Sequence, residues 1–370
     1  MTTRLDIDRT DIVIVGAGIL GASLAYFLAR SGVYPLVLDR VGPAAEASGA
    51  NAGMIGASGG SPGTTLPLSL LSAKLYDQAS SELDEPIHFH RSGRLLLAHS
   101  ASDLAERETY ARERQRLGLN VEMLYGDEVR EIEPILSDKV VGAAYAPDDG
   151  KIDPIRATVA YLNTACRLGA RFEPGVEVES LIVSGGAVRG VVVNGQRVAA
   201  ERVVLAAGAW SGFIAETAGI KLPVVPGRGQ MLVTAPVQPV TPRVLRAVVI
   251  GMRQMDEGNV VIGSEVEFVG YDKEVAPMTL ARYCRLIKDT IPALAEVTVQ
   301  RVWAGVRPMT PDNLPIVGGV RGLAGLDLLT GHGRSGMTFG PASALALAEI
   351  ILHGKTAIPI EPFSLDRFSD

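Results

Sequence analysis

Three glycines near the N-terminus have the spacing that proteins use to bind the pyrophosphate of a dinucleotide. Gly16, Gly18 and Gly21 form a G-x-G-x-x-G motif, and Asp39 follows it. The first glycine permits a tight turn, the second lets backbone N–H groups approach the phosphates, and the third lets a helix pack closely. An acid at the position of Asp39 accepts hydrogen bonds from the adenosine ribose. These residues predict dinucleotide binding and leave both NAD and FAD open.

The elements that must position these residues surround them in the required order. Residues 12–15 are a short apolar run with β-branched character, and residues 22–30 are helix-like and end before Gly32. A second apolar run, residues 36–38, leads directly into Asp39. Strand, glycine turn, helix, strand and acid together form the context in which this motif binds a nucleotide.

Length and composition exclude several other classes of protein. A chain of 370 residues suffices for about two domains with sizeable cores. The net charge of -6 offers no broad basic surface, so we expect no nucleic-acid binding. The two cysteines, Cys166 and Cys284, are too few for an iron–sulfur cluster, and the histidines show no metal-ligand spacing, so no metal site is expected.

The same chain shows no targeting or anchoring signal. No apolar run reaches the roughly 18 residues that a membrane span needs. The charged N-terminal residues lack the apolar core of a secretion signal. A cytoplasmic location without a membrane span is therefore the expectation.

Beyond Asp39 the chain departs from a repeating strand–helix pattern. Residues 41–65 are rich in Gly, Ala and Ser, and we interpret them as a loop that lies close to a ligand rather than as a flexible linker. Residues 89–99 predict a pair of strands joined by a Ser-Gly turn. Residues 176–200 predict a three-stranded meander with a hairpin turn at Asn-Gly, and residues 202–210 predict a buried strand that ends in Ala-Ala-Gly.

These features together resemble the D-amino acid oxidase superfamily. That group contains glycine oxidase, sarcosine oxidases and the catalytic β subunits of heteromeric amino-acid dehydrogenases. An NAD dehydrogenase would continue the strand–helix pattern after Asp39, whereas this chain does not, so the resemblance selects FAD. The matching segments follow the family's order over essentially the whole chain: 16–21 (GAGILG), 39–40 (DR), 47–54 (ASGANAGM), 206–210 (AAGAW), 303–308 (WAGVRP) and 331–336 (GHGRSG).

The resemblance implies an α/β fold made of two domains. The first is a discontinuous Rossmann-type FAD-binding domain that includes the β-meander. The second is an α+β substrate domain built on a mixed or antiparallel sheet. The implied division assigns residues 1–82, 147–222 and 307–370 to the FAD-binding domain and residues 83–146 and 223–306 to the substrate-binding domain.

The resemblance also implies which residues bind the cofactor. The backbone of Val178 would contact adenine, and residues 332–338 would follow the pyrimidine edge of the flavin. Gly333 and Gly336 precede a helix whose free N–H groups and partial positive charge suit the anionic reduced flavin. The predicted cofactor-binding residues are Gly16, Gly18, Ile19, Leu20, Gly21, Asp39, Arg40, Ala47, Ser48, Ala52, Gly53, Met54, Val178, Ala207, Gly208, Trp210, His332, Gly333, Arg334, Ser335, Gly336, Met337 and Thr338.

The mode of FAD attachment follows from a missing residue. Sarcosine-oxidase relatives carry a cysteine shortly before a Thr-Pro-Asp sequence. Residues 303–312 of this chain, WAGVRPMTPD, contain no cysteine. We therefore expect FAD to be bound non-covalently.

Two arginines are the candidates for substrate binding and catalysis. By resemblance, Arg307 occupies the position that clamps the carboxylate of an amino-acid substrate, and Arg334 lies beside the flavin as a second candidate. A guanidinium group binds a carboxylate through two parallel hydrogen bonds. The alternative for either arginine is a purely structural pairing. His332, between glycines, is interpreted as a local hydrogen-bonding residue rather than a base.

The family's mechanism needs no strong protein base. The Cα–H of a neutral amine transfers as hydride to flavin N5, and the resulting imine is hydrolysed by water. Where glycine oxidase places a tyrosine, this chain has Arg253 and Gln254. This difference predicts polar donors in a pocket for a bulkier, more anionic amino acid than glycine.

Three functions remain open from the sequence. The first is the catalytic subunit of a heteromeric dehydrogenase of the opine, hydroxyproline or proline type, whose partner carries FMN or an iron–sulfur centre. The second is a stand-alone glycine, sarcosine or D-amino acid oxidase that produces H2O2. The third is a non-catalytic FAD-binding protein. The segments RQMDEGNVVIG and RPMTPDNLPIVGG favour the heteromeric subunit.

Overall fold

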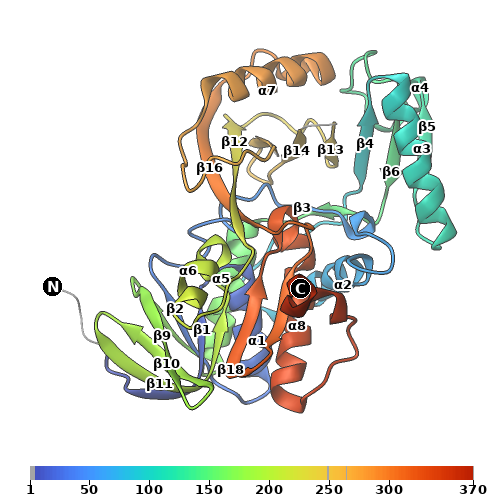
Figure 1. Cartoon of the computed structure of the whole chain (residues 1–370). Helices are drawn as coiled ribbons and strands as arrows, with labels where there is room; N and C mark the ends of the chain where they lie inside the picture. The colour runs from blue at the N-terminus through green and yellow to red at the C-terminus, as the bar shows by residue number, and fades with distance from the viewer. Residues whose placement is uncertain (1–4, 248–249, 264, 370) are drawn as a thin grey trace.

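The protein consists of two lobes, each built around an eight-stranded sheet (Figure 1). The structure, a computed structural model, describes residues 5–247, 250–263 and 265–369. A third, two-stranded sheet of β3 (Met54–Ile55) and β7 (Gly150–Lys151) lies between the lobes (Figure 1).

The first lobe contains the predicted nucleotide-binding strands. Its sheet has the order β17-β18-β10-β11-β1-β2-β8, with β9 paired to β10. The strands β8, β2, β1, β11 and β18 are parallel to one another, whereas β9, β10 and β11 form an antiparallel meander and β17 is antiparallel to β18. The bounds are β1 (Arg9–Val15), β2 (Leu36–Asp39), β8 (Arg171–Pro174), β9 (Val178–Ser184), β10 (Ala187–Val193), β11 (Gln196–Leu205), β17 (Ile316–Val320) and β18 (Leu323–Thr330).

The central strand β1 is apolar on both of its sides, and each side contributes to a different core. Ile12 and Ile14 join the core formed by the helices, whereas Val13 and Val15 join the core beneath the meander. Side chains of a strand alternate between its two faces, so a continuous apolar run is buried on both. The helices of this lobe are α1 (Ile19–Arg30), α2 (Leu66–Glu82), α5 (Pro154–Arg167), α6 (Ser211–Glu216) and α8 (Gly336–His353).

Helix α8 is also the one membrane candidate in the described part of the chain. The segment Gly333–His353 is long and apolar enough to span a bilayer, contrary to the expectation from the sequence. However, 56% of its apolar window is buried inside the protein, and α8 packs against α1 and α2. A core helix passes the same test, so the segment is weak evidence for a span.

The second lobe contains a sheet that is antiparallel except where β13 pairs with β4. The order of its strands is β16-β12-β15-β14-β13-β4-β6-β5. The strands are β4 (Arg94–Ala98), β5 (Glu122–Tyr125), β6 (Gly142–Ala146), β12 (Val225–Thr234), β13 (Val244–Arg246), β14 (Gly251–Gln254), β15 (Val260–Gly263) and β16 (Val299–Met309). The helices are α3 (Ala101–Arg116), α4 (Asp127–Ile132) and α7 (Pro277–Thr290).

The two faces of the second sheet have different roles. Leu95, Leu97 and Leu245 form a core with Tyr283 and Ile287 of α7 on one face. Alternation along β4 and β13 therefore sends their even-numbered residues to the opposite face, where Leu96 packs with Ala111 of α3 and lines the cavity beside Arg246. Short 3-10 helices complete the chain: η1 (Ala57–Gly59), η2 (Gly208–Trp210), η3 (Pro292–Leu294), η4 (Gly333–Ser335), η5 (Glu361–Phe363) and η6 (Leu365–Phe368).

The α/β fold with a meander and a mixed second sheet confirms the fold class predicted from the sequence. The predicted strand pair within residues 89–99 is wrong, because only β4 forms there and His90 bridges to Lys151 instead. Gly93, at φ 80°, turns the chain so that its N–H bonds to Asp149 and not to a local hairpin partner. The predicted substrate-binding domain ends at residue 306. Strand β16 continues through this residue without interruption.

Candidate active site

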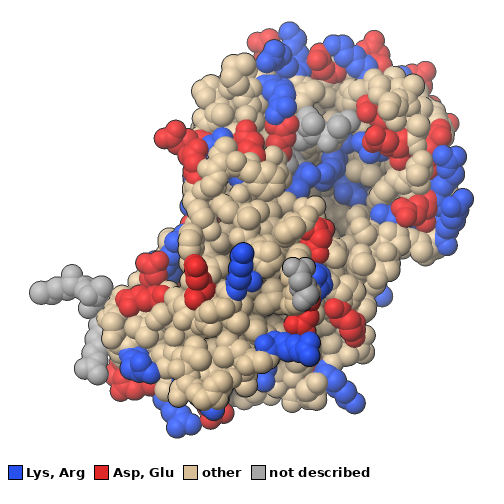
Figure 2. Space-filling view, in the orientation of Figure 1, with Lys and Arg blue, Asp and Glu red and all other residues tan. Residues whose placement is uncertain are grey.

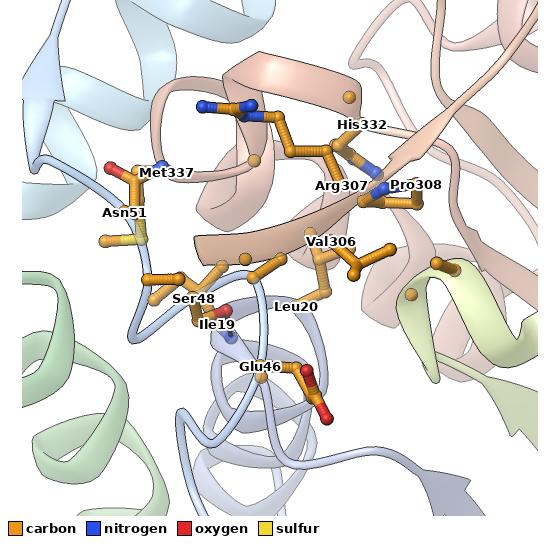
Figure 3. A pocket seen from close by; sticks show the side chains of 18 of the residues that line it. Ile19, Leu20, Glu46, Ser48, Asn51, Val306, Arg307, Pro308, His332 and Met337 are labelled. Atoms are coloured by element: carbon orange, nitrogen blue, oxygen red, sulfur yellow. Dashed lines mark hydrogen bonds between the residues drawn. The ribbon is translucent and has the colours of Figure 1, made fainter. Parts of the chain in front are cut away.

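One large cavity, of about 800 Å³, lies between the two sheets and is lined by both lobes. It extends from the turn between β1 and α1 to the strands β4, β13 and β16 of the second lobe. Figure 3 shows four segments converging on it: Ile19 and Leu20 of α1, Glu46 and Ser48 of the following loop, Val306 and Arg307 of β16, and His332 with Met337. Its length and lining make it the candidate site for a dinucleotide and a substrate.

The glycine turn at the start of α1 has the geometry that the motif predicts. Gly16 has φ 112°, a conformation that side chains disfavour, and a Cβ there would strike the backbone of Ala206. A Cβ on Gly21 would strike the carbonyl oxygen of Gly16, so this glycine sets how closely α1 lies on the turn. Gly21 itself does not line the cavity, since its role is packing.

Asp39 holds the turn together in addition to facing the cavity. Its Oδ2 accepts the N–H of Ala17 at 2.8 Å, and its Oδ1 accepts the N–H groups of Val41 and Gly42, each at 2.9 Å. A carboxylate oxygen has two lone pairs, so the group retains capacity for a ribose hydroxyl. The acid thus positions the glycine turn as well as forming the expected nucleotide contact surface.

The N-terminus of α1 offers free donors to a pyrophosphate. Ser48 Oγ accepts the N–H of Ile19 at 2.9 Å, whereas the N–H groups of Gly18 and Leu20 have no acceptor among the described residues. Gly18 and Leu20 both line the cavity. Backbone donors at a helix N-terminus together with its partial positive charge bind phosphate. The site therefore fits the pyrophosphate of FAD.

The small-residue loop after Asp39 lies against the cavity, as expected. Ala47, Ser48, Ala52 and Met54 line it, while Gly53 lies just behind. Gly53 has φ 69°, and a Cβ there would strike the carbonyl of Ile152. Close backbone packing on both sides explains why the loop is made of small residues.

The segment before α8 closes the other side of the cavity. His332 Nε2 lies 3.0 Å from Ser343 Oγ, and burial lowers the pKa of His332 to about 3. The imidazole is therefore neutral at physiological pH and acts as a local hydrogen-bonding group, as the sequence predicts. Tyr76 of α2 donates a hydrogen bond to the carbonyl oxygen of Met337 at 2.7 Å and fixes the first turn of α8.

The cavity brings together nearly all of the residues predicted to bind the cofactor. Gly21 and Gly53 are the two that do not line it. The predicted cofactor-binding residues that do line it, from segments far apart in sequence, are Gly16, Gly18, Ile19, Leu20, Asp39, Arg40, Ala47, Ser48, Ala52, Met54, Val178, Ala207, Gly208, Trp210, His332, Gly333, Arg334, Ser335, Gly336, Met337 and Thr338.

At the substrate end, Arg307 extends from β16 across the cavity (Figure 3). Its Nη1 donates to the carbonyl oxygen of Glu265 at 2.8 Å, and no carboxylate of the described residues pairs with it. Burial, and then the charge of Arg334, lower the pKa of Arg307 to about 10, so the group stays cationic at neutral pH. A Cβ on Gly229 of β12 would overlap the Arg307 guanidinium, so a glycine at this position leaves the space that the Arg307 side chain occupies.

The two residues expected to supply polar donors to the substrate do not do so. The Arg253 Nε donates to the carbonyl oxygen of Ala52, and Gln254 is occupied by the backbone of residues 237–241 and Gly258. Neither residue lines the cavity. The prediction is wrong because β14 pairs in a register that directs both side chains into packed structure.

The sequence missed a second group of polar lining residues. Arg94, Arg107, Tyr110 and Arg246 border the cavity from β4, α3 and β13. A signal for two of them exists, since Arg94 begins the apolar run RLLLA and Arg246 ends VLR. A charged residue in a short buried strand is unusual and needs a partner.

Nothing in the described residues indicates a metal site or a covalent bond between a cysteine and the cofactor. No cluster of His, Cys, Asp and Glu there is able to hold a metal ion. Cys166 and Cys284 lie on α5 and α7, and neither lines the cavity.

Comparison with known proteins adds to this geometry. Residues 11–350 match the DAO family model, described as FAD dependent oxidoreductase. The chain belongs to the DAO family. It is an FAD-dependent oxidoreductase that acts on amino acids or amines.

Individual relatives cover nearly the whole chain. Hydrogen cyanide synthase subunit HcnC of Pseudomonas aeruginosa is 30% identical, covering 97% of this chain and 96% of the relative. D-amino acid dehydrogenase of Rhizobium johnstonii is 29% identical, covering 96% and 99%. Among solved structures, glycine oxidase from Geobacillus kaustophilus has a TM-score of 0.92 at 26% identity, covering 97% and 99%. Iminodiacetate oxidase from Chelativorans sp. BNC1 has a TM-score of 0.87 at 28% identity, covering 95% and 98%.

Proposed function

We propose that the chain is the catalytic subunit of a cytoplasmic, partner-dependent dehydrogenase that oxidises the Cα–N bond of an amino or imino acid. The observation that carries the substrate class is the Arg307 guanidinium, which faces the cavity with no carboxylate partner among the described residues. A planar guanidinium group binds a carboxylate in a fixed, two-point geometry. This grip orients the Cα of an amino acid within the cavity.

The chain's own residues define the remaining chemistry. FAD, when bound, supplies the two-electron acceptor and an isoalloxazine ring that needs compensation of negative charge on reduction. The N-terminus of α8, at Gly336 and Met337, provides partial positive charge at the edge of the cavity. Arg307 and Arg334 supply full charges at the same end.

The same positive charges favour the reactive form of the amine. A cation near an ammonium group lowers the pKa of that group, so the substrate loses a proton to water more readily in this site than in solution. His332 is a weak base in this site, because burial lowers its pKa to about 3. Binding, orientation and charge thus account for what the protein contributes.

Two observations support a partner as the electron acceptor. The chain has two cysteines and hence no iron–sulfur relay of its own. Two relatives match this chain over almost their full length. One is named as a subunit of hydrogen cyanide synthase, and the other is named as a D-amino acid dehydrogenase. The partner would carry FMN or an iron–sulfur centre, and the substrate class extends to proline-, hydroxyproline- and opine-type amines.

A stand-alone oxidase is the second candidate, favoured by the structural likeness to glycine oxidase. The decisive experiment has two arms. Anaerobic mixing with D-, L-, N-alkyl and opine-type amino acids should bleach the flavin absorption with at least one of them. With that substrate, turnover should be fast with an artificial dye and slow with oxygen. Turnover with oxygen at about 1–10 s⁻¹ would identify an oxidase instead, and no bleaching by any amine would refute both enzymes.

A further inference from the structure

The cavity continues beyond Arg307 into a region bordered by arginines of the second lobe. Arg94 and Leu96 of β4 and Arg246 of β13 lie on the same face of the sheet, because Leu96 pairs directly with Arg246 in the parallel ladder. Arg107 and Tyr110 of α3 complete this border. Figure 2 shows Lys and Arg side chains gathered in the hollow between the two lobes.

These arginines differ in whether a carboxylate of the protein already neutralises their positive charge. Arg94 Nη2 lies 2.7 Å from Oδ2 of Asp149, a carboxylate with no exposed surface, and bonds to the Tyr110 hydroxyl. Asp149 also accepts hydrogen bonds from the N–H and the hydroxyl of Ser58. Arg107 approaches Glu106 at 3.7 Å. Arg94 therefore serves the structure of the lobe.

Arg246 has no such balance. In the described part of the chain it forms no ion pair and no hydrogen bond, yet it is half-buried on the cavity wall. Burial, followed by the charges of Arg334, Arg94 and Arg107, lowers the pKa of Arg246 to about 10. A guanidinium held among like charges destabilises the empty protein and gains most from an anionic ligand.

The acids of the cavity do not supply that anion. The four acidic residues that line it are Asp39, Glu46, Glu177 and Glu179, all on the side of the glycine turn and the meander. The α-carboxylate of an amino acid matches Arg307, which leaves Arg246 for a second negative group. The pattern of charges therefore favours a substrate that carries two anionic groups.

We propose that Arg246 binds a second carboxylate of the substrate, so that the enzyme prefers dicarboxylic amino or imino acids over monocarboxylic ones. This inference rests on the proposed amine-oxidising function and names its substrate class. The second carboxylate has two sources, the side chain of an acidic amino acid or the N-substituent of an N-carboxyalkyl amino acid. Both present the same anion to the same arginine.

The test compares matched pairs of substrates on the purified FAD-containing enzyme. Flavin reduction is followed with glutamate against norvaline, in both enantiomers, and with iminodiacetate against sarcosine. We expect the dicarboxylic member of at least one pair to have a kcat/KM about tenfold or more higher. The pair that shows the preference identifies the source of the carboxylate.

Variants connect the preference to Arg246. In Arg246→Gln, the ratio of dicarboxylate to monocarboxylate kcat/KM should fall to within about threefold of unity, whereas Arg246→Lys should retain part of it because a point charge remains. Arg116→Gln, on the exposed end of α3, is the matched control and should keep the parental ratio. FAD content and thermal melting of each variant separate misfolding from a loss of preference.

A ligand that does not react gives an independent measurement. Glutarate should perturb the flavin absorption at lower concentration than pentanoate, and Arg246→Gln should remove the difference. Equal kcat/KM values in all pairs, or a preference that survives Arg246→Gln, would overturn the inference and leave the amine-oxidising function intact. If no amine reduces the flavin, the proposed function fails instead, and the glutarate comparison alone decides whether Arg246 binds an anion.

Discussion

Arg307 is the residue on which the proposed substrate class most directly depends. Lysine at this position keeps the charge but loses the planar fork, so Arg307→Lys should lower kcat/KM for the amino acid by about tenfold or more. Arg307→Ala should lose more. The flavin spectrum should remain, since the backbone donors of α1 are remote from this change. Stopped-flow reduction under anaerobic conditions measures the effect, and parental kinetics in both variants would refute the clamp.

His332 gives a prediction about pH. Burial lowers its pKa to about 3, so the imidazole is neutral from about pH 5 to pH 9 and changes charge only below that window. The inflections of kcat/KM against pH should therefore stay at the same pH in His332→Asn, even where the overall rate falls because the bond to Ser343 is altered. A limb near neutrality that disappears in the variant would show that His332 titrates during catalysis.

At the scale of elements, one segment of the second lobe contacts the cofactor end of the cavity. We call Tyr271 and Lys273 the latch. The Tyr271 hydroxyl donates to the carbonyl oxygen of Ala209 at 2.8 Å, and the centroids of the Tyr271 and Trp210 rings are 5.2 Å apart. Lys273 Nζ lies 2.6 Å from Oε2 of Glu46. Trp210 and Glu46 both line the cavity, so the latch joins the lobes at the part of the cavity that is predicted to bind the cofactor.

Opening the latch should weaken FAD binding. Tyr271→Ala removes an aromatic contact of about 0.5–1.5 kcal/mol and a hydrogen bond of about 1 kcal/mol, so the Kd for FAD should rise about tenfold. Lys273→Met should raise it only a few-fold, because exposed ion pairs contribute about 0.2–1 kcal/mol. Fluorescence of released FAD reports the Kd. Lys139→Met, which breaks the exposed pair with Asp289, is the control and should have no effect.

The cofactor half of the site was predictable from sequence because its chemistry is local. The glycine turn, the loop of small residues and the segment before α8 each carry their own backbone requirement, such as the positive φ of Gly16 and Gly53. A short motif is then sufficient to place each of these segments at the cavity.

The substrate half was less predictable because it depends on the register of distant strands. Arg246 reaches the cavity only because β13 pairs in parallel with β4, about 150 residues earlier in the chain. Arg253 lies on the neighbouring strand, and its side chain is held by Ala52. Composition and periodicity do not decide which of two nearby arginines faces a ligand, whereas strand pairing does.

At the scale of the whole molecule, the two lobes are joined by a cavity large enough for a dinucleotide, so FAD should contribute to the stability of the fold. A ligand that binds only the folded state stabilises it by RT ln(1 + [L]/Kd), about 2.7 kcal/mol at a hundredfold excess over Kd.

Acid precipitation should release yellow FAD into the supernatant, because neither Cys166 nor Cys284 lines the cavity. Colour retained in the protein pellet would contradict non-covalent binding.

The apoprotein prepared under milder conditions should melt several degrees lower than the holoprotein, and added FAD should restore the Tm in proportion to the logarithm of its concentration. ADP should restore only part of the difference, because it lacks the flavin half of FAD and would leave the region of the cavity beside Arg307 and α8 unfilled. Gly18→Val should reduce the rescue by both ligands, since its side chain would crowd Ser48 and cover the N–H groups that face the phosphates. If ADP restored the full Tm, the flavin end of the cavity would contribute nothing to stability, and the cofactor would be joined to the fold through its adenosine half alone.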